Sequence, residues 1–105
     1  MNITIPESVT TIKYNAFGCC FSFTSITIPN SVTSIEYEAF YHCRNLRSIE
    51  IPQSVKSIGN NAFITCDKMI VYGEKNSYVE TYAKENSIPF KPYICKSTIY
   101  CIILI

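Results

Sequence analysis

Cysteine and histidine are the residues of this chain that could do chemistry, and they gather at Cys19, Cys20, His42 and Cys43. Thiolate and imidazole groups bind zinc or form a nucleophile–base pair. Zinc ligands usually come as closely spaced pairs such as Cys-x-x-Cys, and the chain has none. We expect Cys43 to point inward and His42 outward, so the two side chains diverge. The sequence therefore predicts no catalytic, metal-binding or cofactor-binding residue, and no enzyme.

Composition further restricts the classes of protein to which this chain can belong. The 105 residues carry a net charge of +1, which provides no electrostatic surface for nucleic acid. Apolar residues make up 48% and charged residues 16%, which argues against intrinsic disorder. The 17 Ile against 2 Leu favour strands over helices. The N-terminus lacks the pattern of a secretory signal, and no apolar run is long enough for a transmembrane span.

An internal repeat organises the elements that would position any site. Ile5-Pro6 recurs as Ile28-Pro29 and as Ile51-Pro52, each time 23 residues further along. Other positions recur at the same interval: Val9, Val32 and Val55; Ile12, Ile35 and Ile58; Phe17, Phe40 and Phe63; Cys20, Cys43 and Cys66. A unit of this length cannot bury its apolar face alone, so the copies must stack and share one core.

We expect each copy of the repeat to form one turn of a solenoid. In Ile26-Thr27-Ile28 the alternation of a strand points both Ile side chains inward and Thr27 outward. Pro29 then ends the strand, because proline has no N–H to donate. Stacked turns place equivalent strands side by side in a parallel sheet, with a right-handed coil. The cysteine column should point one way, which disfavours disulfides.

The pattern IPxSVTxIxxxAFxxCxxLxxI, from residue 3 to about residue 92, resembles the BspA-like leucine-rich repeats. Departures are modest: Gly59 stands where the family often has Gly, Lys13 and Glu36 hold that place in the other copies, and Phe23 and Met69 replace the usual Leu. The resemblance implies a surface-exposed or secreted adhesion and interaction module with no catalysis of its own. The predicted fold is a β-rich α/β solenoid, a short leucine-rich-repeat coil with a C-terminal capping helix.

The two ends differ from the repeat. We expect a solenoid of about three and a half coils over 1–72 and a cap over 73–92, with a helix near 78–85 that begins with the capping box of Ser77 and Glu80. The apolar segment 93–105 fits an edge strand, read-through sequence or the start of an anchor. The first coil has no polar cap. It either docks to another copy by self-association, or the chain is a fragment of a longer array.

Two surfaces remain as candidate sites. The outward side chains of Ser25, Thr27, Ser48 and Glu50 predict a polar strip that suits a protein or glycan partner. A column of Tyr14, Tyr37 and Asn60 provides either interface anchors or a stack that only adds stability. The sequence thus predicts a non-enzymatic interaction or adhesion module, the C-terminal part of a surface or secreted protein. The alternative is a purely structural fragment of a longer array with no ligand of its own.

Overall fold

The computed structural model describes residues 2–92 and contains a parallel-strand β-solenoid of about four turns with one C-terminal helix. The predicted fold class is thereby confirmed. The predictions for the tail 93–105 lie outside the described residues. Among residues 2–92, no helix is long and apolar enough to span a membrane.

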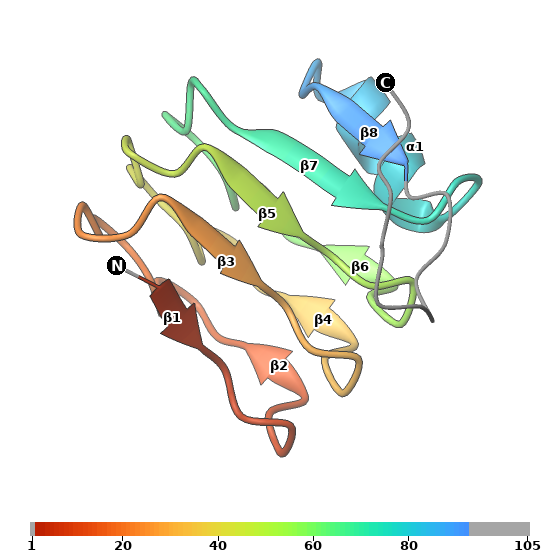
Figure 1. Cartoon of the computed structure of the whole chain (residues 1–105), viewed down its shortest axis with the longest axis horizontal. Helices are drawn as coiled ribbons and strands as arrows, with labels where there is room; N and C mark the ends of the chain where they lie inside the picture. The colour runs from red at the N-terminus through yellow and green to blue at the C-terminus, as the bar shows by residue number, and fades with distance from the viewer. Residues whose placement is uncertain (1, 93–105) are drawn as a thin grey trace.

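Each of the first three turns contributes one strand to each of two parallel sheets, and β7 and β8 extend the larger sheet (Figure 1). The larger sheet has the order β1-β3-β5-β7-β8, and the smaller sheet has the order β2-β4-β6. The larger sheet consists of β1 (Asn2–Thr4), β3 (Ser25–Thr27), β5 (Ser48–Glu50), β7 (Ile70–Gly73) and β8 (Phe90–Pro92). The smaller sheet consists of β2 (Thr11–Ile12), β4 (Ser34–Ile35) and β6 (Ser57–Ile58).

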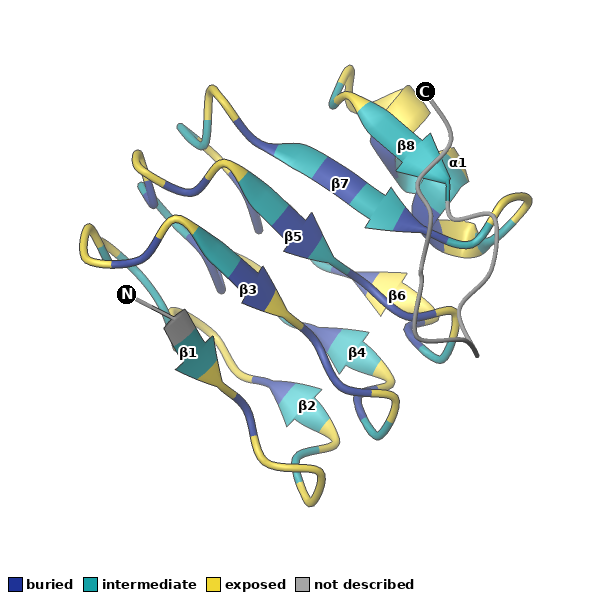
Figure 2. Ribbon diagram, in the orientation of Figure 1, coloured by how far each residue is buried: buried dark blue, intermediate teal, exposed yellow. Residues whose placement is uncertain are grey.

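The register of both sheets follows the 23-residue period. Ile3 pairs with Ile26, which pairs with Ile49, so one apolar column crosses three strands. Ile12, Ile35 and Ile58 form the matching column of the smaller sheet. Figure 2 shows the middle residue of β3 and of β5 buried between more exposed neighbours, as strand alternation requires. The core therefore lies between the two sheets.

Phenylalanine rings stack through this core from coil to coil. Phe40 is fully buried, and its ring centroid lies 5.1 Å from that of Phe17 and 5.2 Å from that of Phe63, in stacked geometry. Backbone hydrogen bonds join the same segments, since Phe17 N donates to Ala39 O and Phe40 N donates to Ala62 O. The repeated Phe is thus a structural column that joins the coils.

Two turn positions in every coil have left-handed backbone, although none is a glycine. They repeat with the period of the sequence: Asn15, Glu38 and Asn61 at φ 56–58°, and Cys19, His42 and Thr65 at φ 57–65°. Non-glycine residues adopt this region rarely, and the surrounding coil must hold them there. The same tight path is therefore built three times.

The C-terminal helix α1 (Tyr78–Glu85) closes the described end of the coil. Ser77 is its N-cap, with the hydroxyl accepting from Glu80 N at 3.3 Å. The Glu80 carboxylate accepts from Asn76 N at 2.6 Å and pairs with Lys84 at 2.9 Å, and these two interactions lower the pKa of Glu80. Val79 and Ala83 are the buried residues of this helix.

Candidate functional site

The outward face of the larger sheet brings the four predicted strip residues together. Ser25 on β3 lies directly opposite Ser48 on β5, and Thr27 lies opposite Glu50. Thr27 is exposed, whereas the other three are half-buried. Neighbouring strands lie about 4.8 Å apart, so these side chains form one compact polar surface.

Beyond Glu50, the outward row extends further than the sequence predicted. In register, Glu50 pairs with Tyr72 on β7, and Tyr72 pairs with Lys91 on β8. Thr4 on β1 continues the row in the other direction, opposite Thr27. We call this row the outer strip; its members are Thr4, Thr27, Glu50, Tyr72 and Lys91. It crosses all five strands.

Sequence reasoning missed Tyr72 and Lys91 because they lie past the third copy. One signal for Tyr72 was available: in Ile70-Val71-Tyr72, the buried Val71 continues the inward column and leaves Tyr72 outward. Lys91 follows a helix, and its pairing with β7 has no counterpart in the repeat. The added residues give the outer strip an aromatic ring between an acid and a base.

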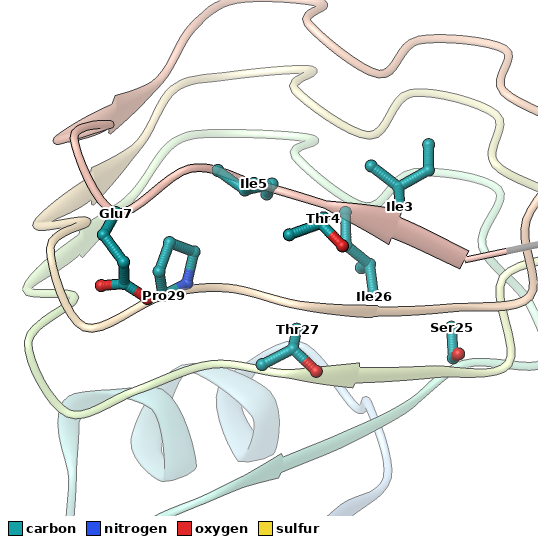
Figure 3. Close-up of a pocket in the computed structure, with 8 residues that line it drawn as sticks. All are labelled: Ile3, Thr4, Ile5, Glu7, Ser25, Ile26, Thr27 and Pro29. Carbon is teal, nitrogen blue, oxygen red and sulfur yellow. The ribbon is translucent and has the colours of Figure 1, made fainter.

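A shallow hollow of about 320 Å³ lies at the β1 end of this face. Figure 3 shows Thr4 on β1 and Thr27 and Ser25 on β3 around it. The hollow is lined by Ile3, Thr4, Ile5, Glu7, Ser25, Ile26, Thr27 and Pro29. Its hydroxyl groups and single carboxylate suit hydrogen bonding rather than covalent chemistry. The predicted self-association through the first coil would occur at this edge and stays a prediction.

The cysteine column lies inside the coil and serves packing. The Cys43 thiol donates to Phe17 O at 2.9 Å, and the Cys66 thiol donates to Phe40 O at 3.2 Å. A hydrogen bond with Cys43, together with burial, raises the pKa of Cys66 above its usual range. Burial likewise raises the pKa of Cys20. Raised pKa values make Cys20 and Cys66 poor nucleophiles and poor metal ligands at neutral pH. The hydrogen bond with Cys66 lowers the pKa of Cys43 to about 7, but Cys43 is fully buried and out of reach of a substrate.

His42 is half-buried rather than fully exposed as predicted. It has φ 59° in a tight turn, and its ring centroid lies 3.9 Å from that of Tyr41. Its Nδ1 atom is buried and makes no hydrogen bond to the described residues. The ring packs against Tyr41, and its Nδ1 atom has no hydrogen bond to a cysteine within residues 2–92.

Metal chemistry has no geometric support in residues 2–92. That part of the chain contains no group of three or more His, Cys, Asp or Glu side chains placed to hold an ion. Four of the cysteines, Cys19, Cys20, Cys43 and Cys66, are free thiols. What the site offers is a flat surface of hydroxyl, aromatic and charged groups.

Comparison with known proteins agrees with this architecture. The family model for the BspA type leucine rich repeat region (6 copies) matches residues 1–102, nearly the whole chain. None of the curated proteins and none of the solved structures matches. Leucine-rich repeats are protein-interaction modules that generally act as non-enzymatic scaffolds.

Proposed function

The chain belongs to the BspA-type leucine-rich repeat family, and from this premise we propose that its outer strip binds a protein partner in adhesion. We place the module at a cell surface or in a secreted protein, as the C-terminal part of a longer leucine-rich-repeat chain. The observation that carries the proposal is the unbroken register of Thr4, Thr27, Glu50, Tyr72 and Lys91 across five strands.

The outer strip has the size and chemistry of an interaction surface. Five strands at about 4.8 Å spacing give a row about 19 Å wide, comparable to the core of a small interface. Tyr72 supplies an amphipathic ring of the kind enriched at binding hot spots. The opposite charges of Glu50 and Lys91 flank it and would select a partner with complementary charges.

Rigidity also supports binding at this face. Ile26, Ile49 and Val71 anchor the three central strands in the core and are 0–3% exposed. Side chains on a rigid sheet lose little backbone freedom when a partner docks, so less binding energy is spent on ordering the surface. The outer strip is therefore better suited to recognition than the turns that flank it.

The test is capture of the full chain on a surface coated with reconstituted basement membrane. The double variant Thr27→Ala/Glu50→Ala should lower capture at least about tenfold, because it removes two adjacent side chains of the outer strip. Because Thr27 is exposed and Glu50 is half-buried, its free energy of unfolding should fall by no more than about 2 kcal/mol, and the variant should stay folded.

A matched control carries the same two substitutions on α1. Thr81→Ala/Glu85→Ala replaces one Thr and one Glu that are exposed on the helix, and it should leave capture unchanged. Equal capture by the wild-type chain and the outer-strip variant would contradict the proposal. Absence of capture by every form would favour the structural alternative without a ligand.

A further inference from the structure

The smaller sheet carries a second surface, which begins at two tyrosines whose tilted rings contact each other. Tyr14 follows β2 and Tyr37 follows β4, and their ring centroids lie 4.6 Å apart. Both side chains are about half exposed, at 50% and 54%. The equivalent residue after β6 is Asn60, so the aromatic column ends after two coils. Tyr14 covers one side of the Tyr37 ring, and the side toward the third coil has no aromatic neighbour from the repeat.

A groove starts where this column ends. A hollow of about 690 Å³ lies between the second and third coils, and a second hollow of about 480 Å³ continues it to the end of α1. The two share Ile58, Gly59, Asn60 and Asn61. We call the combined surface the amide groove; its main side chains are Tyr37, Asn60, Asn61, Tyr82 and Asn86.

Gly59 lies where the two hollows of the groove meet, and the second coil packs closely against it. In the second coil its place is taken by Glu36, whose Oε1 accepts from Tyr14 N at 2.8 Å and so fills the space beside Tyr14. Gly59 has no side chain to do this beside Tyr37. A Cβ atom there would collide with the backbone nitrogen of Tyr37, so only glycine fits without a shift. The coils approach closely at this point, and the surface beside them stays open.

The far wall of the groove is held in place by the cap. Tyr78 accepts a hydrogen bond from Ile58 N at 3.1 Å, which ties α1 to the edge of β6. The Asn86 side chain donates to Tyr82 O at 2.8 Å, which orients its amide. Tyr82 packs edge-on against Phe63, with centroids 6.3 Å apart. The cap therefore holds Tyr82 and Asn86 in place at the far wall of the groove.

The chemistry of these groups selects one class of ligand. Within residues 2–92, Glu36 is the one charged side chain among those lining either hollow, and its carboxylate already accepts from Tyr14 N. Asn side chains both donate and accept, as sugar hydroxyls do. An aromatic ring face packs against the C–H face of a pyranose ring. An anionic ligand would find no countercharge among these side chains.

We propose that the amide groove binds a neutral oligosaccharide, with one sugar ring stacked on Tyr37 and hydroxyl groups bonded to Asn60, Asn61 and Asn86. This site is separate from the outer strip, because it is built on the smaller sheet and the cap. The module therefore has a glycan site on one side of the coil and a protein-binding face on the other.

The experiment titrates the full chain with maltotriose, with triacetylchitotriose and with anionic trigalacturonate, followed by ¹H–¹⁵N NMR. At least one neutral trisaccharide should bind and shift the side-chain amide signals of Asn60, Asn61 and Asn86. The anionic probe should bind at least about tenfold more weakly. Absence of binding by both neutral probes, or shifts confined to other residues, would overturn the proposal.

Two single variants separate ligand binding from packing. Tyr37→Ala and Tyr14→Ala break the same pair of contacting rings, but only Tyr37 lines the groove. Tyr37→Ala should weaken the saccharide at least about tenfold, and Tyr14→Ala should change its affinity less than about twofold. Equal losses would show that the pair acts through structure, and the proposal would be wrong.

Two more variants place the ligand. Asn60→Tyr extends the aromatic column over Tyr37, and it should abolish saccharide binding in a chain that still folds. Thr27→Ala/Glu50→Ala should leave saccharide binding unchanged, because those residues lie on the larger sheet. The two proposals can thus be contradicted separately: saccharide binding can be absent while the outer strip binds its partner, and the outer strip can bind nothing while the saccharide binds. Retained binding by Asn60→Tyr would contradict the proposed position of the sugar.

Discussion

The two sheets share three coils but end differently. The larger sheet continues past the repeat through β7 to β8, and β8 adds the Lys91 side chain to its outer face. The smaller sheet stops at β6, where a tyrosine hydroxyl from α1 takes the place of a further strand. One face is therefore continuous and flat, and the other ends in a groove.

The reason lies in which positions the repeat keeps constant. Inward residues are copied because each must stack on its equivalent one coil away, as Phe17, Phe40 and Phe63 do. Outward residues have no such requirement. The position of Tyr37 in the second coil can therefore hold Asn60 in the third, and the position of Glu36 can hold Gly59. Stability in this coil therefore comes from the positions at which the copies agree, and the proposed binding specificity comes from the positions at which they differ.

The largest effect is expected when the central ring of the phenylalanine column is removed, because this position is the same in all three copies. Phe40→Ala should lower the free energy of unfolding by about 3–5 kcal/mol, because the ring is fully buried between two stacked neighbours. The measurement is chemical denaturation of both forms. Both sheets should lose stability together, since they share the core.

Phe17→Ala is the control, at the end of the same column. Phe17 has a stacked partner on one side and is only partly buried, so its removal should cost clearly less than that of Phe40. Equal losses at the two positions would mean that the coils do not share their stability through this stack.

The interior of the fold could be predicted almost entirely from the repeat. Ile26, Val32, Phe40 and Cys43 are all buried, as the inward positions of a stacked coil require. The reason is physical: a 23-residue unit has one way to hide its apolar side chains, and three copies repeat that solution. His42 was less predictable, because its burial depends on the adjacent Tyr41 ring.

The candidate sites could be predicted only in part. Ser25, Thr27, Ser48 and Glu50 follow from strand alternation within the copies. The continuation to Lys91 depends on a pairing between β7 and a strand beyond the helix, which no repeat position encodes. The amide groove arises where Gly59 and Asn60 depart from the copies, and it includes Asn86 from the cap.

A smaller effect should come from the helix that closes both sheets. Ser77→Ala removes the N-cap hydroxyl that accepts from Glu80 N, and it should cost about 1 kcal/mol of unfolding free energy. Because Tyr78 is the first residue of that helix and accepts from Ile58 N, amide exchange at Ile58 should also become faster. The measurements are denaturation and hydrogen exchange followed by NMR.

Ser22→Ala supplies the comparison, since Ser22 is exposed in a turn of the first coil. It should change neither the unfolding free energy by more than about 0.5 kcal/mol nor the exchange of Ile58. Unchanged exchange of Ile58 in Ser77→Ala would show that the edge of β6 does not depend on the helix start.

An effect confined to high pH concerns Tyr82, where the cap meets the groove. Burial, with a further contribution from Tyr78, raises the pKa of Tyr82 to about 12 from its ordinary 10. The unfolded chain therefore loses this proton at lower pH than the folded chain, so Tyr82 makes the protein less stable as pH rises from 10 towards 12. In Tyr82→Phe this loss is absent, and the unfolding free energy should fall less steeply with pH over that window.

Lysine deprotonation and the other tyrosines affect the wild-type chain and Tyr82→Phe alike, so the difference between their two pH profiles isolates Tyr82. If the pH profiles of the wild-type chain and Tyr82→Phe were parallel, the Tyr82 hydroxyl would ionise as it does in water. The side chain of Tyr82 would then be exposed to solvent, in contrast to the burial that the structure shows.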